Sequence, residues 1–311
     1  MKGVLLINMG GANSPKELKS FLGRMFNDPF ILPFGKTGRK MLSFIISNSR
    51  YKRSWKKYMD IGGTPIIRAT EYTKKVLQLE LGTEYMVEAA FSYSKPLIRE
   101  AISVFVHQGF NEITVIPLYP QASFTTTDSV KKEVYDAVEG NENIKINFVH
   151  EFCHHPVFVS FWSKLIENHN RTNQCTAPYL LFSAHSIPEY LVDKGDTYPQ
   201  GIHKSAKAIA GKMGYEYGVA YQSGMKRGKW LGPDVKQSLR TLSAKGINEI
   251  ILIPISFVNE NLETLYDMDR DILPFAKELS GIHKISRVNI PVADAEFVKL
   301  LHDLVKTNEL K

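Results

Sequence analysis

The chain has 311 residues, of which 43% are hydrophobic and 23% charged, a composition typical of a globular protein with about two domains. The separation of its two cysteines, Cys153 and Cys175, fits no zinc knuckle and no iron–sulfur cluster, so we expect a reducing, cytoplasmic setting. No stretch reaches the roughly 18 apolar residues of a membrane-spanning helix, and the apolar run after Met1 is too short for a signal peptide.

The net charge of +7 comes from one segment of the chain. Between Pro29 and Met59 there are eight basic residues and no acidic one. Nucleic acid is the first class of partner that such a patch suggests, but aliphatic residues are interleaved with the charges and no nucleic-acid motif accompanies them. We therefore expect no nucleic acid, and instead an anionic small molecule or an acidic membrane surface.

The first half of the chain alternates predicted strands and helices. Strand 4–8 precedes a helix that begins after the N-cap Ser14, has Pro15 as its first residue and ends near Phe26. After a long segment without an assigned element, the predicted elements are helix 67–80, strand 86–92, helix 97–108, strand 112–117, helix 127–138 and strand 145–150.

The second half repeats this alternation. Its predicted elements are strand 179–184, helix 202–213, strand 217–222, helix 234–244, strand 249–254, helix 262–278, strand 284–290 and helix 293–306. The sequence of 109–117, GFNEITVIP, nearly recurs at 246–254, GINEIILIP, with an offset of 137 residues. The opening strands of the halves are offset by about 175 residues, which indicates an insertion at about 13–62.

The alternation predicts an α/β fold of two similar Rossmann-like domains, each a four-stranded parallel sheet flanked by helices, around a cleft. The first domain is predicted over 1–150 and the second over 151–292. Right-handed crossovers place the carboxyl ends of all parallel strands at one edge of each sheet, where ligands bind in open α/β folds.

Two of these strand ends have side chains suited to chemistry. His185 follows a buried strand, and the strand that ends at Pro254 leads into an acidic stretch that contains Glu263. An imidazole and a carboxylate at one sheet edge can move protons or bind a divalent metal. The structural alternatives are a histidine satisfied within a turn, and acids that only stabilise a helix N-terminus.

Other strand-end loops have weaker signals. Trp230 either forms a flat aromatic surface or anchors a packed loop. The hydroxyl run that starts at Ser123 and includes Thr125 serves either a ligand or a helix cap. Asn8-Met-Gly-Gly lacks the third glycine of a dinucleotide loop, which makes a nucleotide-binding protein the least favoured reading.

The chain resembles the ferrochelatases, which insert ferrous iron into a porphyrin to make haem. The resemblance spans nearly the whole chain and rests on short motifs in a fixed order. These are Asn8-Met-Gly-Gly, Phe26-Asn-Asp-Pro, Ile61-Gly-Gly-Thr-Pro-Ile, Tyr119-Pro-Gln, Ser183-Ala-His-Ser-Ile-Pro, Gly195-Asp-Thr-Tyr-Pro-Gln, Tyr221-Gln-Ser, Trp230-Leu-Gly-Pro and Leu262-Glu-Thr-Leu. The resemblance implies a chelatase-like fold in which the insertion forms a lip and the C-terminal helix, 293–311, packs back on the first domain.

The resemblance implies that His185 and Glu263 are the catalytic and metal-binding residues on one porphyrin face, and it leaves open which binds iron and which takes protons. Met9 would lie on the opposite face and favour protoporphyrin over coproporphyrin. The expected substrate contacts are Met9, Phe26, Ile31, Leu32, Tyr93, Gln121, Ser123, Thr125, Trp230 and Tyr266. The lip would cover the macrocycle and touch the inner face of a membrane peripherally.

Porphyrin and Fe²⁺ are then small-molecule substrates, and no cofactor is expected. The C-terminal cysteine cluster of some members is absent, so no iron–sulfur cluster is expected either. Asn261 replaces a histidine of some members, and Ser92-Tyr-Ser-Lys replaces an Arg-Tyr-x-His. The alternatives are a cobalt or sirohydrochlorin chelatase, and a porphyrin or haem carrier with His185 as axial ligand. The oligomeric state is left open.

Overall fold

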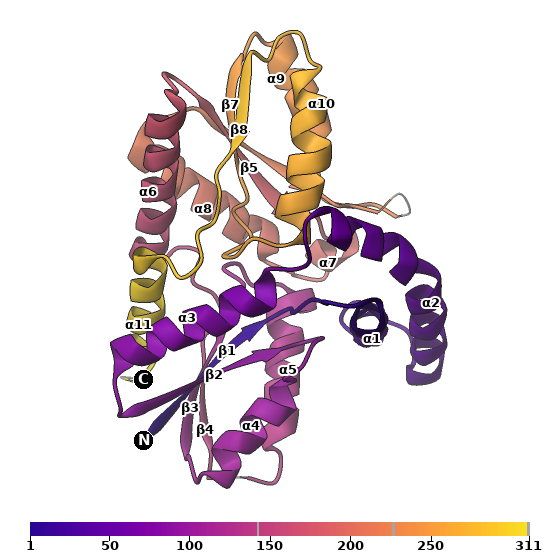
Figure 1. Cartoon of the computed structure of the whole chain (residues 1–311), viewed down its shortest axis with the longest axis vertical. Coiled ribbons are helices and arrows are strands. Elements are labelled where there is room, and N and C mark those ends of the chain that lie inside the picture. Colours follow the sequence, from indigo (N-terminus) through magenta and orange to yellow (C-terminus); the bar gives the residue numbers. More distant parts are fainter. Residues whose placement is uncertain (142, 226–227, 310–311) are drawn as a thin grey trace. The chain divides into compact units, whose positions relative to one another are not determined.

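The chain divides into two units in the computed structural model, which describes residues 1–141, 143–225 and 228–309 (Figure 1). The first unit comprises Met1–Glu151 and Val292–Lys311, and the second comprises Phe152–Pro291. The division after Glu151 lies one residue from the predicted boundary. The C-terminal helix α11 (Ala295–Glu309) belongs to the first unit, where it contacts the helix α3 (Ile66–Leu81).

The first unit is built on a four-stranded parallel sheet in the order β2-β1-β3-β4. Its strands are β1 (Lys2–Asn8), β2 (Tyr85–Phe91), β3 (Glu112–Pro117) and β4 (Lys145–Phe148). Figure 1 shows α3 and α11 on one face of this sheet, and α4 (Ile98–His107) and α5 (Ser129–Val138) on the other. Burial of apolar side chains such as Leu5, Ile102 and Val115 between these layers stabilises the unit.

The second unit has the same topology, with the strand order β6-β5-β7-β8. Its strands are β5 (Tyr179–His185), β6 (Tyr217–Gln222), β7 (Glu249–Ile253) and β8 (Lys284–Arg287). The helices α9 (Val235–Ala244) and α10 (Leu273–Lys277) pack on the side of Leu181 and Leu252, and α8 (Tyr198–Met213) also contacts β5 and β6. The matching strand orders confirm the predicted duplication and the α/β fold class.

Three helices were not predicted: α2 (Lys36–Asp60), α6 (Pro156–Asn173) and the short α7 (Glu189–Asp193). Helix α2 begins after Gly35 without a side-chain cap and has no acidic residue in its first turn, so it lacks the usual start signals. Helix α6 begins with the run PVFVSFW, whose β-branched and aromatic residues are equally typical of a strand.

Helices α1 (Pro15–Met25) and α2 form most of the predicted insertion and pack against each other. The cap of α1 is the predicted one, because the Ser14 side chain accepts a hydrogen bond from the backbone N–H of Glu17. Among the described residues, no helix combines the length and the apolar character that crossing a membrane requires.

Candidate functional site

His185 is the last residue of β5, a central strand of the second unit. The strand order reverses at β5, because β6 lies on one side of it and β7 on the other. In open α/β sheets, ligands bind at the carboxyl ends of the strands that flank such a reversal. The His185 side chain is half-buried, which leaves it accessible to a ligand at this edge.

The loop after β7 is tied to the end of β5 by hydrogen bonds. The backbone N–H of Ile255 donates to the carbonyl of Ser183 (3.1 Å), and the N–H of His185 donates to Oγ of Ser256 (3.2 Å). The hydroxyl of Tyr198 also hydrogen-bonds to Ser256, and burial of this side chain raises its pKa. These contacts hold the backbone of His185 against the loop that leads to Glu263.

Glu263 is the first residue of η2 (Glu263–Ile272), and its side chain is half-buried. A reciprocal pair of hydrogen bonds spans it: the N–H of Thr264 donates to Oδ1 of Asn261 (3.0 Å), and the N–H of Asn261 donates to Oγ1 of Thr264 (2.9 Å). The Asn261 side chain is therefore used as a helix cap.

Segment η2 is a π-helix and not the start of the predicted α-helix over 262–278. The N–H of Leu273 donates to the carbonyl of Met268, five residues earlier. An α-helix and a π-helix differ by one residue in this spacing, and apolar periodicity over ten residues does not distinguish them. π-Helical turns are frequent at functional sites.

The end of β6 also contacts η2. The Ser223 hydroxyl donates to Oδ2 of Asp267 (2.9 Å), and Ser223 has a positive φ of 63°. A left-handed conformation at a residue other than glycine is costly and persists only where surrounding contacts enforce it. The end of β6 thus contacts η2, and the end of β5 contacts the loop that leads from β7 to η2.

Trp230 and Tyr266 lie in this same region of the second unit. Both side chains are half-buried, and Tyr266 belongs to η2. The backbone beside Trp230 pairs with the segment after His185, since the N–H of Leu231 donates to the carbonyl of Ile187 (3.0 Å). Trp230 is thus tied to the segment after His185, and Tyr266 lies one turn from Glu263 in η2.

The corresponding edge of the first unit has hydroxyls and amides in place of acids. Met9 follows β1 and is half-buried, whereas Gln121 and Ser123 are buried in the loop after β3. The Ser123 hydroxyl caps the short π-helix η1 (Phe124–Asp128) by accepting from the N–H of Thr125 (3.3 Å). The sequence left open whether this hydroxyl run binds a ligand or caps a helix, and in the structure Ser123 caps a helix.

The sequence as a whole is similar to that of known proteins. The ferrochelatase family model matches residues 1–309. The chain belongs to the ferrochelatase family. It is 37% identical to the ferrochelatase of Aquifex aeolicus, with 98% of each chain aligned, and 29% identical to that of Geotalea daltonii, with 98% of this chain and 97% of the relative aligned.

Solved structures of chelatases share the fold of this ferrochelatase family member. SirB from Bacillus subtilis with Fe³⁺ superposes with a TM-score of 0.60 at 12% identity, covering 100% of this chain and 98% of SirB. CbiX of siroheme biosynthesis superposes with a TM-score of 0.58 at 15% identity, covering 98% and 99%. At these identities the likeness establishes the two-domain α/β architecture alone.

Three predicted substrate contacts of the family member lie in its insertion. Phe26 is only 8% exposed, with the guanidinium of Arg50 5.9 Å from the centre of its ring, so it presents little surface to a substrate. Ile31 and Leu32 are half-buried, and their N–H groups both donate to the carbonyl of Asp28. These bonds fold the segment between α1 and α2 into a tight turn.

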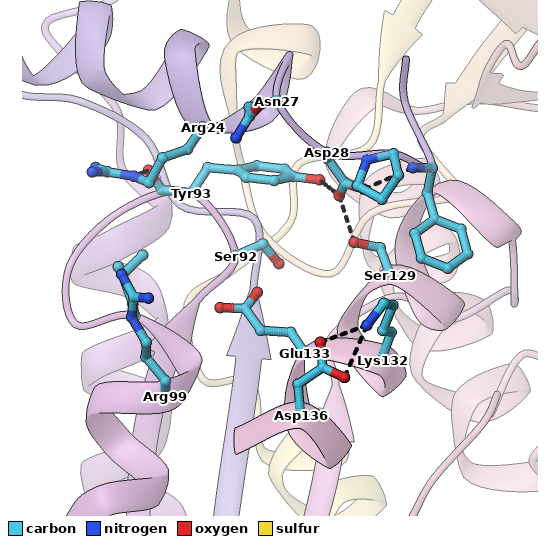
Figure 2. A pocket seen from close by; sticks show the side chains of 13 residues that line it. Arg24, Asn27, Asp28, Ser92, Tyr93, Arg99, Ser129, Lys132, Glu133 and Asp136 are labelled. Carbon is cyan, nitrogen blue, oxygen red and sulfur yellow. Dashed lines mark hydrogen bonds and ion pairs between the residues drawn. The ribbon is translucent and has the colours of Figure 1, made fainter. Parts of the chain in front are cut away.

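Tyr93, another predicted contact, belongs to a buried polar cluster around Asp28 (Figure 2). Its hydroxyl donates to Oδ2 of Asp28 (2.7 Å), the Ser129 hydroxyl donates to the same oxygen, and the N–H of Phe30 donates to Oδ1 (2.8 Å). Burial and the neighbouring Asp28 carboxylate raise the pKa of Tyr93. The Tyr93 hydroxyl thus links the insertion, which contains Asp28, to the segment that follows β2.

The Asp28 cluster borders a pocket of about 260 Å³ that Figure 2 shows from close by. Glu133 points into this pocket, and burial, followed by the charge of Asp28, raises the pKa of its carboxyl to about 7. No signal in the sequence distinguished Glu133 from Asp136, the other acid of α5, because burial of Glu133 depends on the residues that pack around it.

Proposed function

We propose that this chain inserts Fe²⁺ into protoporphyrin IX, releases two protons and forms protohaem, the terminal step of haem biosynthesis. The observation that supports this function best is the position of His185 and Glu263: His185 ends β5, and Glu263 begins η2 after the loop that follows the neighbouring strand β7. Membership of the ferrochelatase family supports a porphyrin and ferrous iron as substrates.

The proposed reaction breaks two pyrrole N–H bonds and forms bonds from the porphyrin nitrogens to iron, with no change in oxidation state. Neutral His185 accepts a proton or binds Fe²⁺ through a ring nitrogen, and Glu263 balances the positive charge that results. Nitrogen and oxygen ligands of this kind accept Fe²⁺, Zn²⁺ and Co²⁺, so the pair itself does not select iron.

The choice of protoporphyrin rests on Met9 in this proposal. Family members with tyrosine at this position act on coproporphyrin, and an apolar thioether offers no hydroxyl to a more polar macrocycle. Titration of the protein with each porphyrin tests this choice by absorbance. We expect tighter binding of protoporphyrin IX, and tighter binding of coproporphyrin would contradict the assignment.

The decisive experiment mixes the purified chain with Fe²⁺ and protoporphyrin IX without oxygen and measures haem formed over many turnovers. We expect His185→Ala to keep porphyrin binding and to lower turnover by about 10²–10⁴-fold, the usual range for loss of an acid–base group. His203→Ala is the matched control, because His203 is an exposed histidine of α8 in the same unit.

Other outcomes would support a different function. Haem bound once per chain without turnover would indicate a carrier, with His185 as its axial ligand. Turnover with sirohydrochlorin and Co²⁺, and none with protoporphyrin, would indicate the second enzymatic candidate. Near-normal turnover of His185→Ala would remove that residue from the mechanism.

We also propose that α2 contacts an anionic membrane surface peripherally. Its first half exposes apolar side chains beside lysines, with Met41 62%, Phe44 68% and Ile45 52% exposed. Its second half exposes basic residues such as Lys52 and Arg53. Apolar residues that enter a headgroup layer, next to cations that attract anionic lipids, are the features of an interfacial helix.

Cosedimentation with vesicles of neutral or anionic phospholipid tests this contact. We expect binding to anionic vesicles that weakens with salt, and further weakening when Lys52 and Arg53 are both changed to Glu. The matched control changes Lys204 and Lys207 to Glu, because these exposed lysines of α8 alter the net charge equally. Equal binding by both double variants, or none by the wild type, would contradict the proposal.

A further inference from the structure

A buried arginine at the end of β8 connects two parts of the chain that flank Glu263. Arg287 is the last residue of β8, and its side chain is 3% exposed. Its Nε and Nη2 donate to Oδ1 and Oδ2 of Asp269, each at 2.7 Å, and its Nη1 donates to Oε1 of Glu260 at 2.8 Å. We call these three residues the Arg287 cluster.

The carboxylates of Glu260 and Asp269 lie on either side of Glu263 in the sequence, so their bonds to Arg287 fix both ends of the segment that contains it. Glu260 precedes Glu263 by three residues in the loop after β7, and Asp269 follows it by six residues within η2. The planar guanidinium binds Asp269 with two parallel hydrogen bonds, a geometry that fixes orientation as well as distance. The same Oε1 of Glu260 also accepts from the N–H of Ile290 (2.9 Å).

The charges in the cluster favour this arrangement. Burial lowers the pKa of Arg287, but the hydrogen bonds and charges of Asp269 and Glu260 outweigh burial and raise the pKa overall, so the guanidinium stays charged. Replacement of a buried ion cluster by apolar residues is often neutral or stabilising. Stability alone therefore gives little reason for placing such a cluster against η2.

We infer that Arg287 is a positioning residue for Glu263, an inference that rests on the proposed function of this site. The cluster restrains the segment from Glu260 to Asp269, and so keeps the Glu263 carboxylate at the edge where β5 presents His185. Residues that orient a metal-binding or proton-accepting group without touching the substrate affect turnover more than substrate affinity.

Arg287→Lys tests this role because it keeps the positive charge and loses the paired hydrogen bonds to Asp269. We expect kcat for haem formation to fall by about 10–100-fold, the usual effect of removing a group that orients a metal ligand, with KM for porphyrin changed by less than about 3-fold. Asp269→Asn, which leaves the contact between Arg287 and Glu260, should lower kcat in the same direction.

The matched control lies at the other end of the same strand. Lys284 begins β8, and its ammonium pairs with Oε1 of Glu249 at 3.1 Å. Lys284→Met should lower thermal stability and leave kcat within about 2-fold of the wild type, because this pair is at the amino-terminal edge of the sheet. If Lys284→Met lowered kcat as much as Arg287→Lys does, the role of Arg287 would be structural and not one of positioning Glu263.

A double-mutant cycle with Glu263 distinguishes positioning from general damage. If Arg287 acts through Glu263, Arg287→Lys should change kcat by less than about 2-fold when Glu263→Gln is already present. Full additivity of the two losses, or normal kcat in Arg287→Lys alone, would overturn the inference. A wild-type chain that makes no haem would instead reject the proposed function.

Discussion

The two units share a backbone plan and differ in the chemistry of one edge. In each, the third strand is followed by a loop and a π-helix, η1 after β3 and η2 after β7. Residues 124–128 of η1 read FTTTD, whereas 263–272 of η2 read ETLYDMDRDI. Strand β1 ends at Asn8, where β5 ends at His185. Duplication thus produced two equivalent edges, and titratable groups gathered at the second.

Acidic residues also serve different purposes in the two units. Asp28 of the first unit is buried and accepts three hydrogen bonds, so its carboxylate is used within the structure. Glu263 of the second unit is half-buried at the end of a strand-end loop. The Asp28 carboxylate, held by three donors, stabilises the fold, whereas Glu263 lies after a strand-end loop, where α/β folds bind ligands.

The largest expected effect is a loss of turnover on changing Glu263, compared with a change in η1, the equivalent segment of the first unit. Glu263→Gln keeps the shape of the side chain and removes its charge, so turnover should fall by about 10²–10⁴-fold while porphyrin affinity changes little. Thr125→Ala, a change in η1, should leave turnover within about tenfold. Steady-state haem formation measures both turnover rates. Equal losses would contradict the view that only the second unit carries the catalytic groups.

Loss of the Asp28 carboxylate should be the largest effect on stability. Asp28→Asn replaces an oxygen that accepts from Tyr93 and Ser129 with an amide, which should cost about 1–3 kcal/mol of unfolding free energy. Thermal denaturation measures this cost. Arg24→Lys, which alters a donor to the carbonyl of Tyr93 at the same pocket, is the milder comparison. An unchanged melting temperature in Asp28→Asn would show that the cluster does not hold the insertion.

Ser123→Ala tests whether the hydroxyl run in the first unit is a cap or a catalytic group. Loss of the hydrogen bond from the N–H of Thr125 should cost about 1 kcal/mol of unfolding free energy. Turnover of the folded variant should stay near that of the wild type. A loss of turnover as large as that of Glu263→Gln would assign chemistry to both edges.

Glu133→Gln should have an effect on stability that depends on pH. The pKa of this carboxyl is raised from its ordinary 4.5 to about 7, so the unfolded chain releases the proton first as pH increases. Ionisation therefore lowers stability progressively between about pH 4.5 and pH 7, and the full cost is present above pH 7. The variant should melt about 2–4 °C higher at pH 8 and little changed at pH 4. Equal melting shifts at both pH values would contradict the raised pKa.

Most of the strands and helices followed from local patterns. The predicted strands 112–117 and 217–222 match β3 and β6 residue for residue. For β3 the reason is a clear apolar run between turn signals, since all but its first residue are buried. Edge strands β4 and β8 are shorter than predicted, at 145–148 and 284–287. Within the part of the chain that the structure describes, β4 pairs only with β3 and β8 only with β7, and each pairing covers four residues.

The chemistry of the candidate site was also visible in the chain, since His185 and Glu263 each follow a recognisable buried strand. What the residues around them do was not visible. Asn261 caps η2, Tyr93 binds Asp28 and Arg287 binds two distant carboxylates, and each of these contacts joins residues whose approach depends on packing. Local sequence encodes periodicity and strand ends, whereas partner choice, π-helical spacing and burial of single charges arise only when separate segments are brought together.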